Sequence, residues 1–174
     1  VAADHMGLGG IHTIEAMAKV KQVVPETVFP HGYAVLNADD DLVYKMKNDL
    51  KCNIALFSMD ENNPRIKEHA KANGLACVYE NGYVTIMKGT WKIRVLPARD
   101  IPLTYEGKAI HNINNCLPAV LSTYLFRDIT IEDIRTGLQT FIPSESLTPG
   151  RLNFFNFKHF TILADFAHNP HGLQ

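Results

Sequence analysis

The sequence predicts an α/β fold in which a parallel-type sheet with helices is followed by a small antiparallel meander. Short apolar runs at 33–36 and 54–57 alternate with helical stretches, which favours parallel strands because their connections need crossovers. Asn81-Gly82 lies between two apolar pairs and tolerates the positive φ angles of a tight hairpin, which predicts the meander over about 75–96. Apolar residues make up 46% of the 174 positions, enough for a packed core in one domain or slightly more.

Three helices and two strands are predicted before the meander. They are a helix over 13–24, a strand over 33–36, a helix over 40–48, a strand over 54–57 and a helix over 65–72. Pro64 fits the start of the third helix, where the missing N–H is not needed, and Asn73-Gly74 is a C-terminal signal. The order strand, helix, strand, helix is typical of a parallel sheet.

Two helices are expected after the meander. The first covers about 114–126, and its Pro118 is expected in or near the first turn because proline disrupts a helix interior. The second begins at Thr130, where Asp133 three residues later gives a start resembling a capping box.

The best boundary in the chain is the segment 143–150, which is rich in Ser, Thr, Pro and Gly. Two short strand-like runs follow it, at 154–157 and 160–164. About thirty residues lie beyond the boundary, which is too few for a stable domain of their own.

Charge and hydropathy exclude several classes of partner. Lys and Arg number 17 and Asp and Glu 18, so the formal charge of −1 gives no basic surface for nucleic acid or anionic lipid. No apolar run approaches the ~18–20 residues of a membrane span, and the first residues do not resemble a signal peptide. We therefore expect no nucleic acid and no membrane as partners. Because the chain begins at Val1 without Met, we expect it to be a piece of a longer polypeptide.

Cys52, Cys77 and Cys116 form neither a CxxC pair nor an even disulfide framework. Each has apolar neighbours in the sequence, and a free cysteine in such a place behaves as a small core residue. We predict three reduced, buried thiols. A reducing compartment, and hence a cytoplasmic location, follows from that prediction.

Lys21 is a candidate catalytic residue because of its place on the first helix. At 100° per residue it falls inside the apolar arc formed by Ile14, Met17, Ala18 and Val24. A buried ammonium costs several kcal/mol unless it is paired or neutralised, so a lysine at this position suggests a function. The alternative is that its stem follows the apolar surface and carries the charge to solvent.

Five further residues have side chains suited to a ligand. His5 follows an aspartate and precedes a glycine-rich turn, where it would hold a metal or move a proton, or simply belong to a polar loop. Asn112 and Asn115 point the same way on a helical turn and suit the edge of a base, but equally suit helix capping. Arg151 lies on a turn and suits a phosphate, and Asp165 ends a strand, where ligand-binding carboxylates often lie.

In this order along the chain, these motifs resemble the muramyl ligase superfamily, which includes the amino-acid ligases of peptidoglycan and folylpolyglutamate synthase. The segments are Asp4-His5, Glu15 to Lys21, Gly32 to Asp40, His111-Asn112-x-x-Asn115, Pro149-Gly150-Arg151 and Asp165 to Pro170. Within the superfamily, Gly32 to Asp40 and the two C-terminal motifs are most similar to the branch that attaches arginine to the aspartate side chains of cyanophycin. The resemblance covers essentially the whole chain.

The resemblance implies an enzyme that uses ATP to activate a carboxylate as an acyl phosphate, which an amine then attacks to form an amide. ATP and Mg²⁺ would be the cofactors, arginine and an aspartate-containing polymer primer the partners, and the full-length enzyme a homo-oligomer. Residues 1–142 would be the later part of the central ATP-binding domain. Residues 143–174 would be a linker and the start of the C-terminal ligase domain.

The resemblance also implies a role for each candidate residue. His5 matches a magnesium ligand, Lys21 the lysine that many members carbamylate to hold a second magnesium, Asn112 and Asn115 the adenine contacts, Arg151 a nucleotide contact, and Asp165 the ribose-binding acid. These chemistries suit the residue types, since amides suit a base and a cation suits phosphate.

This chain departs from the family pattern in two respects. The Gly-Lys-Thr/Ser phosphate loop, which the family carries upstream, is not among these residues, so we expect the isolated chain to be inactive. Phe166 stands where many relatives carry tyrosine. Other interpretations are a peptidoglycan or folylpolyglutamate ligase of the same superfamily, or a nucleotide-binding module without catalysis.

Overall fold

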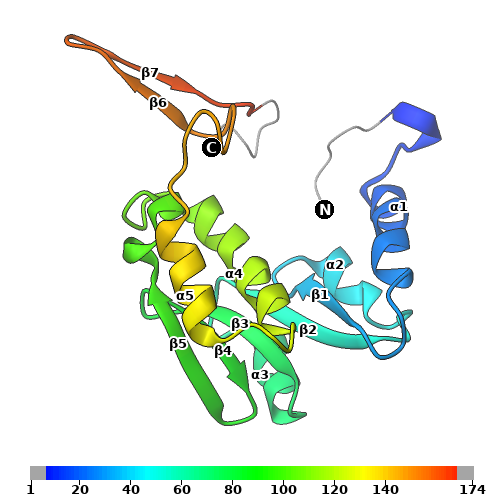
Figure 1. Ribbon diagram of the computed structural model, residues 1–174. Helices are drawn as coiled ribbons and strands as arrows, with labels where there is room; N and C mark the ends of the chain where they lie inside the picture. Colours follow the sequence, from blue (N-terminus) through cyan, green and yellow to red (C-terminus); the bar gives the residue numbers. More distant parts are fainter. Residues whose placement is uncertain (1–6, 168–174) are drawn as a thin grey trace.

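The computed structural model describes residues 7–167, which form a three-layer α/β body with a projecting C-terminal hairpin (Figure 1). The α/β prediction is confirmed. In chain order the elements are η1 (Leu8–Gly10), α1 (Ile14–Glu26), β1 (Tyr33–Asn37), α2 (Asp41–Met46), β2 (Asn53–Ser58), α3 (Pro64–Lys71), β3 (Leu75–Glu80), β4 (Tyr83–Lys88), β5 (Trp91–Pro97), η2 (Ala98–Asp100), η3 (Pro102–Thr104), α4 (Ile110–Tyr124), α5 (Ile131–Thr140), β6 (Asn153–Asn156) and β7 (Thr161–Ala164).

Strands β1 to β5 form one sheet in sequence order. β1, β2 and β3 are parallel, whereas β4 is antiparallel to β3 and β5 is antiparallel to β4. Asn81 and Gly82 turn the chain between β3 and β4 with φ angles of 50° and 84°, as a type I′ turn requires. Because β3 pairs with β2 as well as β4, the meander continues the parallel sheet and is not a separate appendage.

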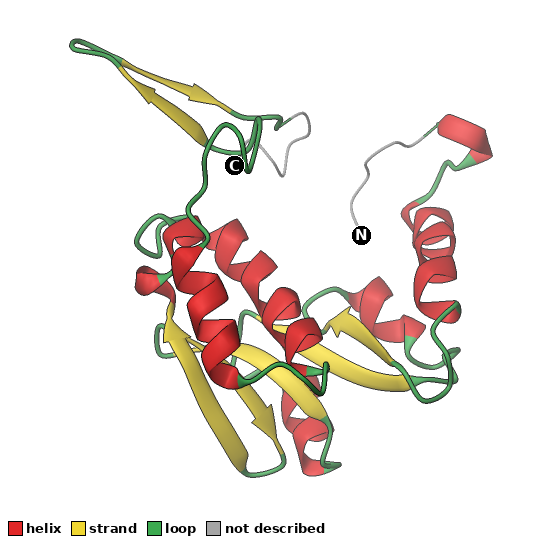
Figure 2. Cartoon of the chain, in the orientation of Figure 1, coloured by secondary structure: helices red, strands yellow, loops and turns green. Residues whose placement is uncertain are grey.

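The central strands are buried on both faces. Ala55 and Cys77 belong to a core cluster that includes α4 and α5, whereas Leu56 and Val78, the residues that follow them, pack with α2 and α3. Successive residues of a strand point to opposite faces, so a sheet covered on both sides needs near-continuous apolar runs. Figure 2 shows α4 and α5 together over one face of this sheet.

All three cysteines are free, as predicted. Cys77 of β3 and Cys116 of α4 are buried in the same core cluster, whereas Cys52 is only half-buried, so the prediction of burial holds for two of the three thiols. Burial raises the pKa of the Cys116 thiol to about 11 and that of Cys77 still further above its usual value. The two core thiols are therefore protonated and serve as small packing residues.

Polar side chains cap the starts of α1, α2 and α5, and the cap at Thr130 is the one that the sequence predicts. The Thr13 hydroxyl accepts the N–H of Ala16 at 3.0 Å, and the Asp40 carboxylate accepts two N–H groups of α2. Thr130 and Asp133 form the reciprocal capping box at the start of α5. These caps satisfy backbone donors that have no partner inside the helix.

Helix α4 begins earlier than the sequence predicts. It starts at Ile110 rather than near residue 114, so Pro118 lies in its interior and not in the first turn. An interior proline costs about 3 kcal/mol because it removes a hydrogen bond and crowds the preceding turn. The helix buries five apolar side chains, which outweighs that cost. They are Ile113, Cys116, Leu117, Val120 and Leu121.

The end of the described chain leaves the body as a β-hairpin. Within the described residues, β6 and β7 pair with each other only, and they project away from the sheet and helices (Figure 2). Phe154 and Leu163 face each other across this hairpin and are each about half exposed. Among residues 7–167, no helix is long and apolar enough to cross a membrane.

The two glycines Gly74 and Gly137 should respond to alanine in opposite directions. A Cβ on Gly74 would lie 2.4 Å from the ring of His69, whose Nε2 lies 3.1 Å from the Leu75 carbonyl oxygen. We expect Gly74→Ala to lower the free energy of unfolding by about 1–3 kcal/mol, because the ring must move. Urea unfolding measures the change.

Gly137 provides the matched control. It lies inside α5, and no packing neighbour comes within 4 Å of the place that an alanine Cβ would take. Gly137→Ala should therefore raise the free energy of unfolding by about 0.5–1 kcal/mol. Equal effects of the two substitutions would show that the His69 ring does not constrain position 74.

Candidate functional site

The structure brings the turn of Arg151, before β6, into contact with Asp165, which follows β7. The Asp165 carboxylate accepts the N–H of Leu152 at 2.9 Å and the N–H of Ala167 at 2.7 Å. The Arg151 guanidinium lies over the Phe166 ring, with its Cζ 5.8 Å from the ring centroid. The two predicted ligand-binding residues flank the β6–β7 hairpin in sequence and are both exposed at its base.

Asn153 organises this turn, although no motif in the sequence includes it. Its Oδ1 accepts the N–H of Gly150 at 2.7 Å, and its Nδ2 donates to the carbonyl of Thr148 at 3.0 Å. The side chain is buried at 7% exposure, unlike that of Arg151 nearby. The signal that could have found it was an asparagine three residues after a glycine, a spacing at which an amide closes a turn.

Asn112 and Asn115 lie on the first two turns of α4, and neither is its N-cap, which is Ala109. Asn112 is half-buried and donates from Nδ2 to the Leu103 carbonyl at 2.8 Å, whereas Asn115 is exposed. The capping alternative is therefore wrong for both. Between them, the Oδ1 of Asn114 is buried with no hydrogen-bond partner among the described residues.

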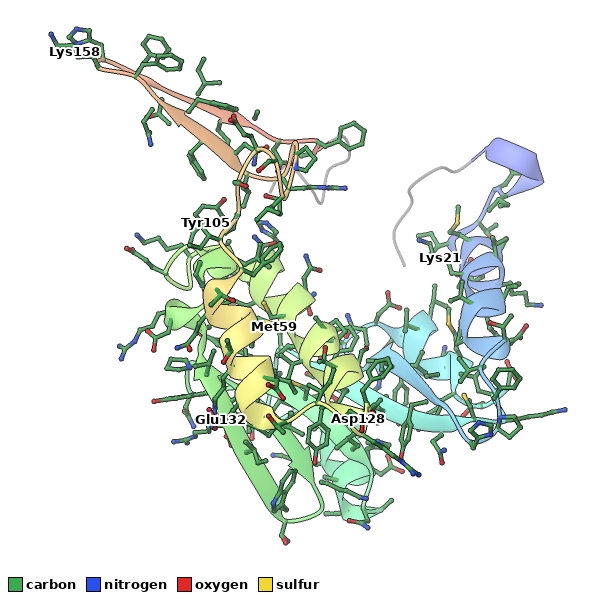
Figure 3. All side chains as sticks on the ribbon, viewed as in Figure 1. Lys21, Met59, Tyr105, Asp128, Glu132 and Lys158 are labelled. Atoms are coloured by element: carbon green, nitrogen blue, oxygen red, sulfur yellow. The ribbon has the colours of Figure 1, made fainter. Side chains whose placement is uncertain are left out.

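Tyr105 connects the region of α4 with the turn that carries Arg151. Its hydroxyl donates to the Leu152 carbonyl at 2.7 Å, and its ring packs edge-on against Phe154 with centroids 5.4 Å apart. Burial raises the pKa of the Tyr105 hydroxyl, which keeps it a donor at neutral pH. Figure 3 places Tyr105 between the body and the segment that leads to β6.

A cavity of about 410 Å³ lies beside this contact. Its wall combines aromatic, apolar and polar side chains from the residue after η3, the segment after α5 and the start of β6. The lining residues are Tyr105, Pro143, Ser144, Glu145, Leu152, Asn153, Phe154 and Phe155.

Lys21 lies apart from these residues, and the prediction that it belongs to a buried arc is wrong. Only Met17 and Ala18 of that arc are buried, whereas Ile14 and Val24 are 37% and 73% exposed. Lys21 is exposed as well, because α1 packs on α2 by one narrow face. The alternative interpretation of the sequence, in which the ammonium of Lys21 reaches solvent, agrees with this exposure.

Lys21 nevertheless lines a second cavity of about 420 Å³, between α1, the open edge of β1 and the end of α4. Val24 and Val28, at and beyond the end of α1, and Ser122 of α4 contribute to the same wall. Figure 3 shows Lys21 on the far side of the molecule from Tyr105. The candidate residues thus fall into two groups in the described chain.

The predicted metal ligand His5 lies outside the described residues. Within residues 7–167, no group of three or more His, Cys, Asp or Glu side chains is placed to hold a metal ion. Asp39, which follows β1, binds protein groups: it accepts the Ser58 hydroxyl at 2.5 Å, the Met59 N–H at 2.8 Å and the Asn63 amide at 2.8 Å. This carboxylate fixes the loops that follow β1 and β2.

Comparison with known proteins gives one family and two groups of relatives. The Mur ligase middle domain model matches residues 1–123. The chain is 51% identical to cyanophycin synthetase from Synechocystis sp. over 100% of its length, and 49% identical to that from Trichormus variabilis over 98%. It is 30% identical to the UDP-N-acetylmuramate–L-alanine ligase of Acetivibrio thermocellus over 94% of its length.

The chain spans only part of these relatives. It covers 20% of the Synechocystis protein, 19% of the Trichormus protein and 31% of the Acetivibrio protein. The resemblance seen in the motifs, to muramyl ligases in general and to the cyanophycin branch in particular, is confirmed.

Replacing Asp165 tests the turn directly. Asp165→Ala removes the acceptor for the N–H groups of Leu152 and Ala167, so both amides should exchange with deuterium about tenfold faster. Hydrogen exchange followed by mass spectrometry measures this effect. The control is Asp128→Ala, another exposed aspartate, which should leave the exchange of both amides unchanged (Figure 3). Unchanged exchange in Asp165→Ala would contradict the turn geometry.

Proposed function

This chain belongs to the Mur ligase family, and on that premise we propose that it contributes the nucleotide-binding residues of an ATP-dependent amide ligase. Residues 1–142 form the later part of the ATP-binding domain, and residues 143–174 form the linker and the start of the C-terminal ligase domain. The observation that carries the proposal is the contact of Tyr105 with Leu152, which links the region of Asn112 to the turn of Arg151 and Asp165.

The side-chain donors and acceptors that these contacts do not use are of the kinds that bind a nucleotide. Asn112 uses one N–H on Leu103, which leaves its other N–H and its oxygen for the edge of adenine, beside the exposed amide of Asn115. Asp165 accepts two backbone N–H groups, and a carboxylate has lone pairs left for ribose hydroxyls. The exposed guanidinium of Arg151 suits a phosphate.

The reaction we propose is the attachment of arginine to the aspartate side chains of cyanophycin. ATP supplies the phosphoryl group that turns the aspartate carboxylate into an acyl phosphate, and the arginine amine then displaces phosphate to form the amide. The support is the identity of about half of all positions with proteins named cyanophycin synthetase, against 30% with the muramate–alanine ligase.

Magnesium would accompany the nucleotide and neutralise phosphate charge when bound. The family resemblance assigns His5 and Lys21 to it, and only Lys21 lies among the described residues. The enzyme is proposed to act in the cytoplasm, a location that the three free cysteines support.

Substrate-dependent ADP release tests the proposal. The full-length polypeptide, given ATP, Mg²⁺ and an aspartate-containing primer, should release ADP only when arginine is added. Asn115→Ala should raise the KM for ATP about fivefold or more, since it removes an amide from the adenine edge. Arg127→Ala, at an exposed arginine elsewhere, should leave KM unchanged. ADP release with UDP-N-acetylmuramate and alanine, and none with arginine, would favour the peptidoglycan reaction instead.

Lys21 and Lys19 form a second matched pair. Both are exposed on α1, so replacing either with alanine should change the free energy of unfolding by less than about 0.5 kcal/mol. In the full-length enzyme, Lys21→Ala should abolish ADP release because it removes the proposed metal-holding group, and Lys19→Ala should retain it. Bicarbonate or small carboxylates should partly restore Lys21→Ala. Equal activity of the two variants would show that Lys21 is an ordinary surface lysine.

A further inference from the structure

We infer that Tyr105 is a positioning residue, which holds the turn of Arg151 and Asp165 at a fixed place relative to α4. The inference rests on the proposed function, because it concerns how the two groups of nucleotide-binding residues are kept in register. None of the motifs in the sequence includes Tyr105. It acts through the backbone of Leu152 rather than by touching the nucleotide.

The contact reaches both residues of the turn. The carbonyl of Leu152 accepts the Tyr105 hydroxyl at 2.7 Å, and the N–H of the same residue donates to Asp165 at 2.9 Å. A single peptide-bonded residue therefore separates the tyrosine from the carboxylate proposed to bind ribose. Arg151 directly precedes that residue, so the same hydrogen bond restrains its backbone.

This hydrogen bond joins the body, residues 7–142, to the hairpin unit, residues 143–167. The ring of Tyr105 adds the edge-on contact with Phe154 across the same boundary. Aromatic pairs of this geometry contribute beyond their buried area. One side chain therefore supplies both a polar and an aromatic contact that hold the hairpin unit to the body.

The segment that carries Tyr105 is itself firmly held. Thr104 is fully buried, and its hydroxyl donates to the Ala98 carbonyl at 2.5 Å and accepts the N–H of Gly107 at 3.0 Å. Tyr105 has the left-handed φ of 51°, and its N–H donates to the Pro102 carbonyl at 3.0 Å. Because these hydrogen bonds fix the backbone of Tyr105, its hydroxyl can hold the Leu152 carbonyl in one place.

The partner residue is in the same unusual backbone region. Leu152 has a φ of 49°, and a side chain with a Cβ adopts this region at a cost of about 1–2 kcal/mol. Such conformations persist where surrounding contacts determine them, and they gather at binding sites. At Leu152 those contacts are the hydroxyl of Tyr105 and the carboxylate of Asp165.

The opposite end of the segment contacts Asn112, one of the two proposed adenine residues. The carbonyl of Leu103 accepts the amide of Asn112 at 2.8 Å, two residues before Tyr105. Residues 103–105 therefore contact the asparagine on one side and the arginine turn on the other. Removing the Tyr105 hydroxyl should loosen the second contact and leave the first intact.

The test is Tyr105→Phe in the full-length polypeptide, which deletes the hydroxyl and keeps the ring against Phe154. We expect the Kd for ATP, measured by calorimetry, to rise about fivefold, because the loss of one hydrogen bond changes an equilibrium constant by about that factor. The rate of trypsin cleavage after Arg151 should rise by a similar factor. At saturating ATP, kcat should change less than twofold, because a loosened turn weakens nucleotide binding without removing a reacting group.

Two further variants complete the experiment. Tyr83→Phe makes the same deletion on β4, where the ring packs with Arg94 and the hydroxyl has no hydrogen-bond partner in the described chain, and it should change neither Kd nor cleavage. Phe154→Leu removes the ring contact at a half-exposed position and should raise the Kd in the same direction. This variant also answers the question if Tyr105→Phe does not fold.

The outcomes separate the inference from the proposed function. Faster cleavage in Tyr105→Phe with an unchanged Kd would overturn the positioning role, since Tyr105 would then hold the fold alone. An unchanged Kd for ATP in Phe154→Leu and Tyr105→Phe, with ATP bound by the wild type, would overturn it as well. Absence of ATP binding by the wild type would overturn the proposed function, and the positioning role with it.

Discussion

Strand β3 is covered by helices on both faces, and the arrangement of the other layers follows from that constraint. Cys77 must pack under α4 and Val78 against the other helical layer, because adjacent residues of a strand point to opposite faces. Each face of the sheet therefore needs a helical layer whose apolar side chains cover it. Helix α4 meets this demand with five buried side chains, and its position on the sheet determines where Asn112 and Asn115 lie. The packing of α4 on the sheet therefore determines the positions of these two asparagines.

The connection from β5 to α4 joins this core to the surface proposed to bind nucleotide. Its buried anchor is Thr104, and the next residue extends a hydroxyl to the segment beyond α5. The hairpin unit of β6 and β7 has no strand partner in the described body, and Tyr105 contacts it through both its hydroxyl and its ring. The proposed site has residues in both parts, so we expect it to be sensitive to those contacts. For this reason we expect the loss of the Tyr105 hydroxyl to weaken ATP binding, although Tyr105 belongs to none of the sequence motifs.

Local chemistry is readable from the sequence, and long-range geometry is not. The capping box of Thr130 and the Asn81-Gly82 turn depend on neighbours within three residues, so their patterns predict the structure correctly. The prediction for Pro118 is wrong because the burial of a whole helical face outweighs a local penalty. The prediction for Lys21 is wrong because periodicity describes a helix but not what packs against it.

The same distinction applies to the site. Residue type and turn position mark Arg151 and Asp165 as candidate ligand residues, and the hydrogen bond from Leu152 to Asp165 joins positions 13 residues apart. Tyr105 acts across 47 residues, and no pattern in its own neighbourhood distinguishes it from other tyrosines. A nucleotide that contacts α4 and the turn together would favour the arrangement that the tyrosine also favours. By thermodynamic linkage, each would then strengthen the other: the hydroxyl would tighten nucleotide binding, and bound nucleotide would stabilise the attachment of the hairpin unit.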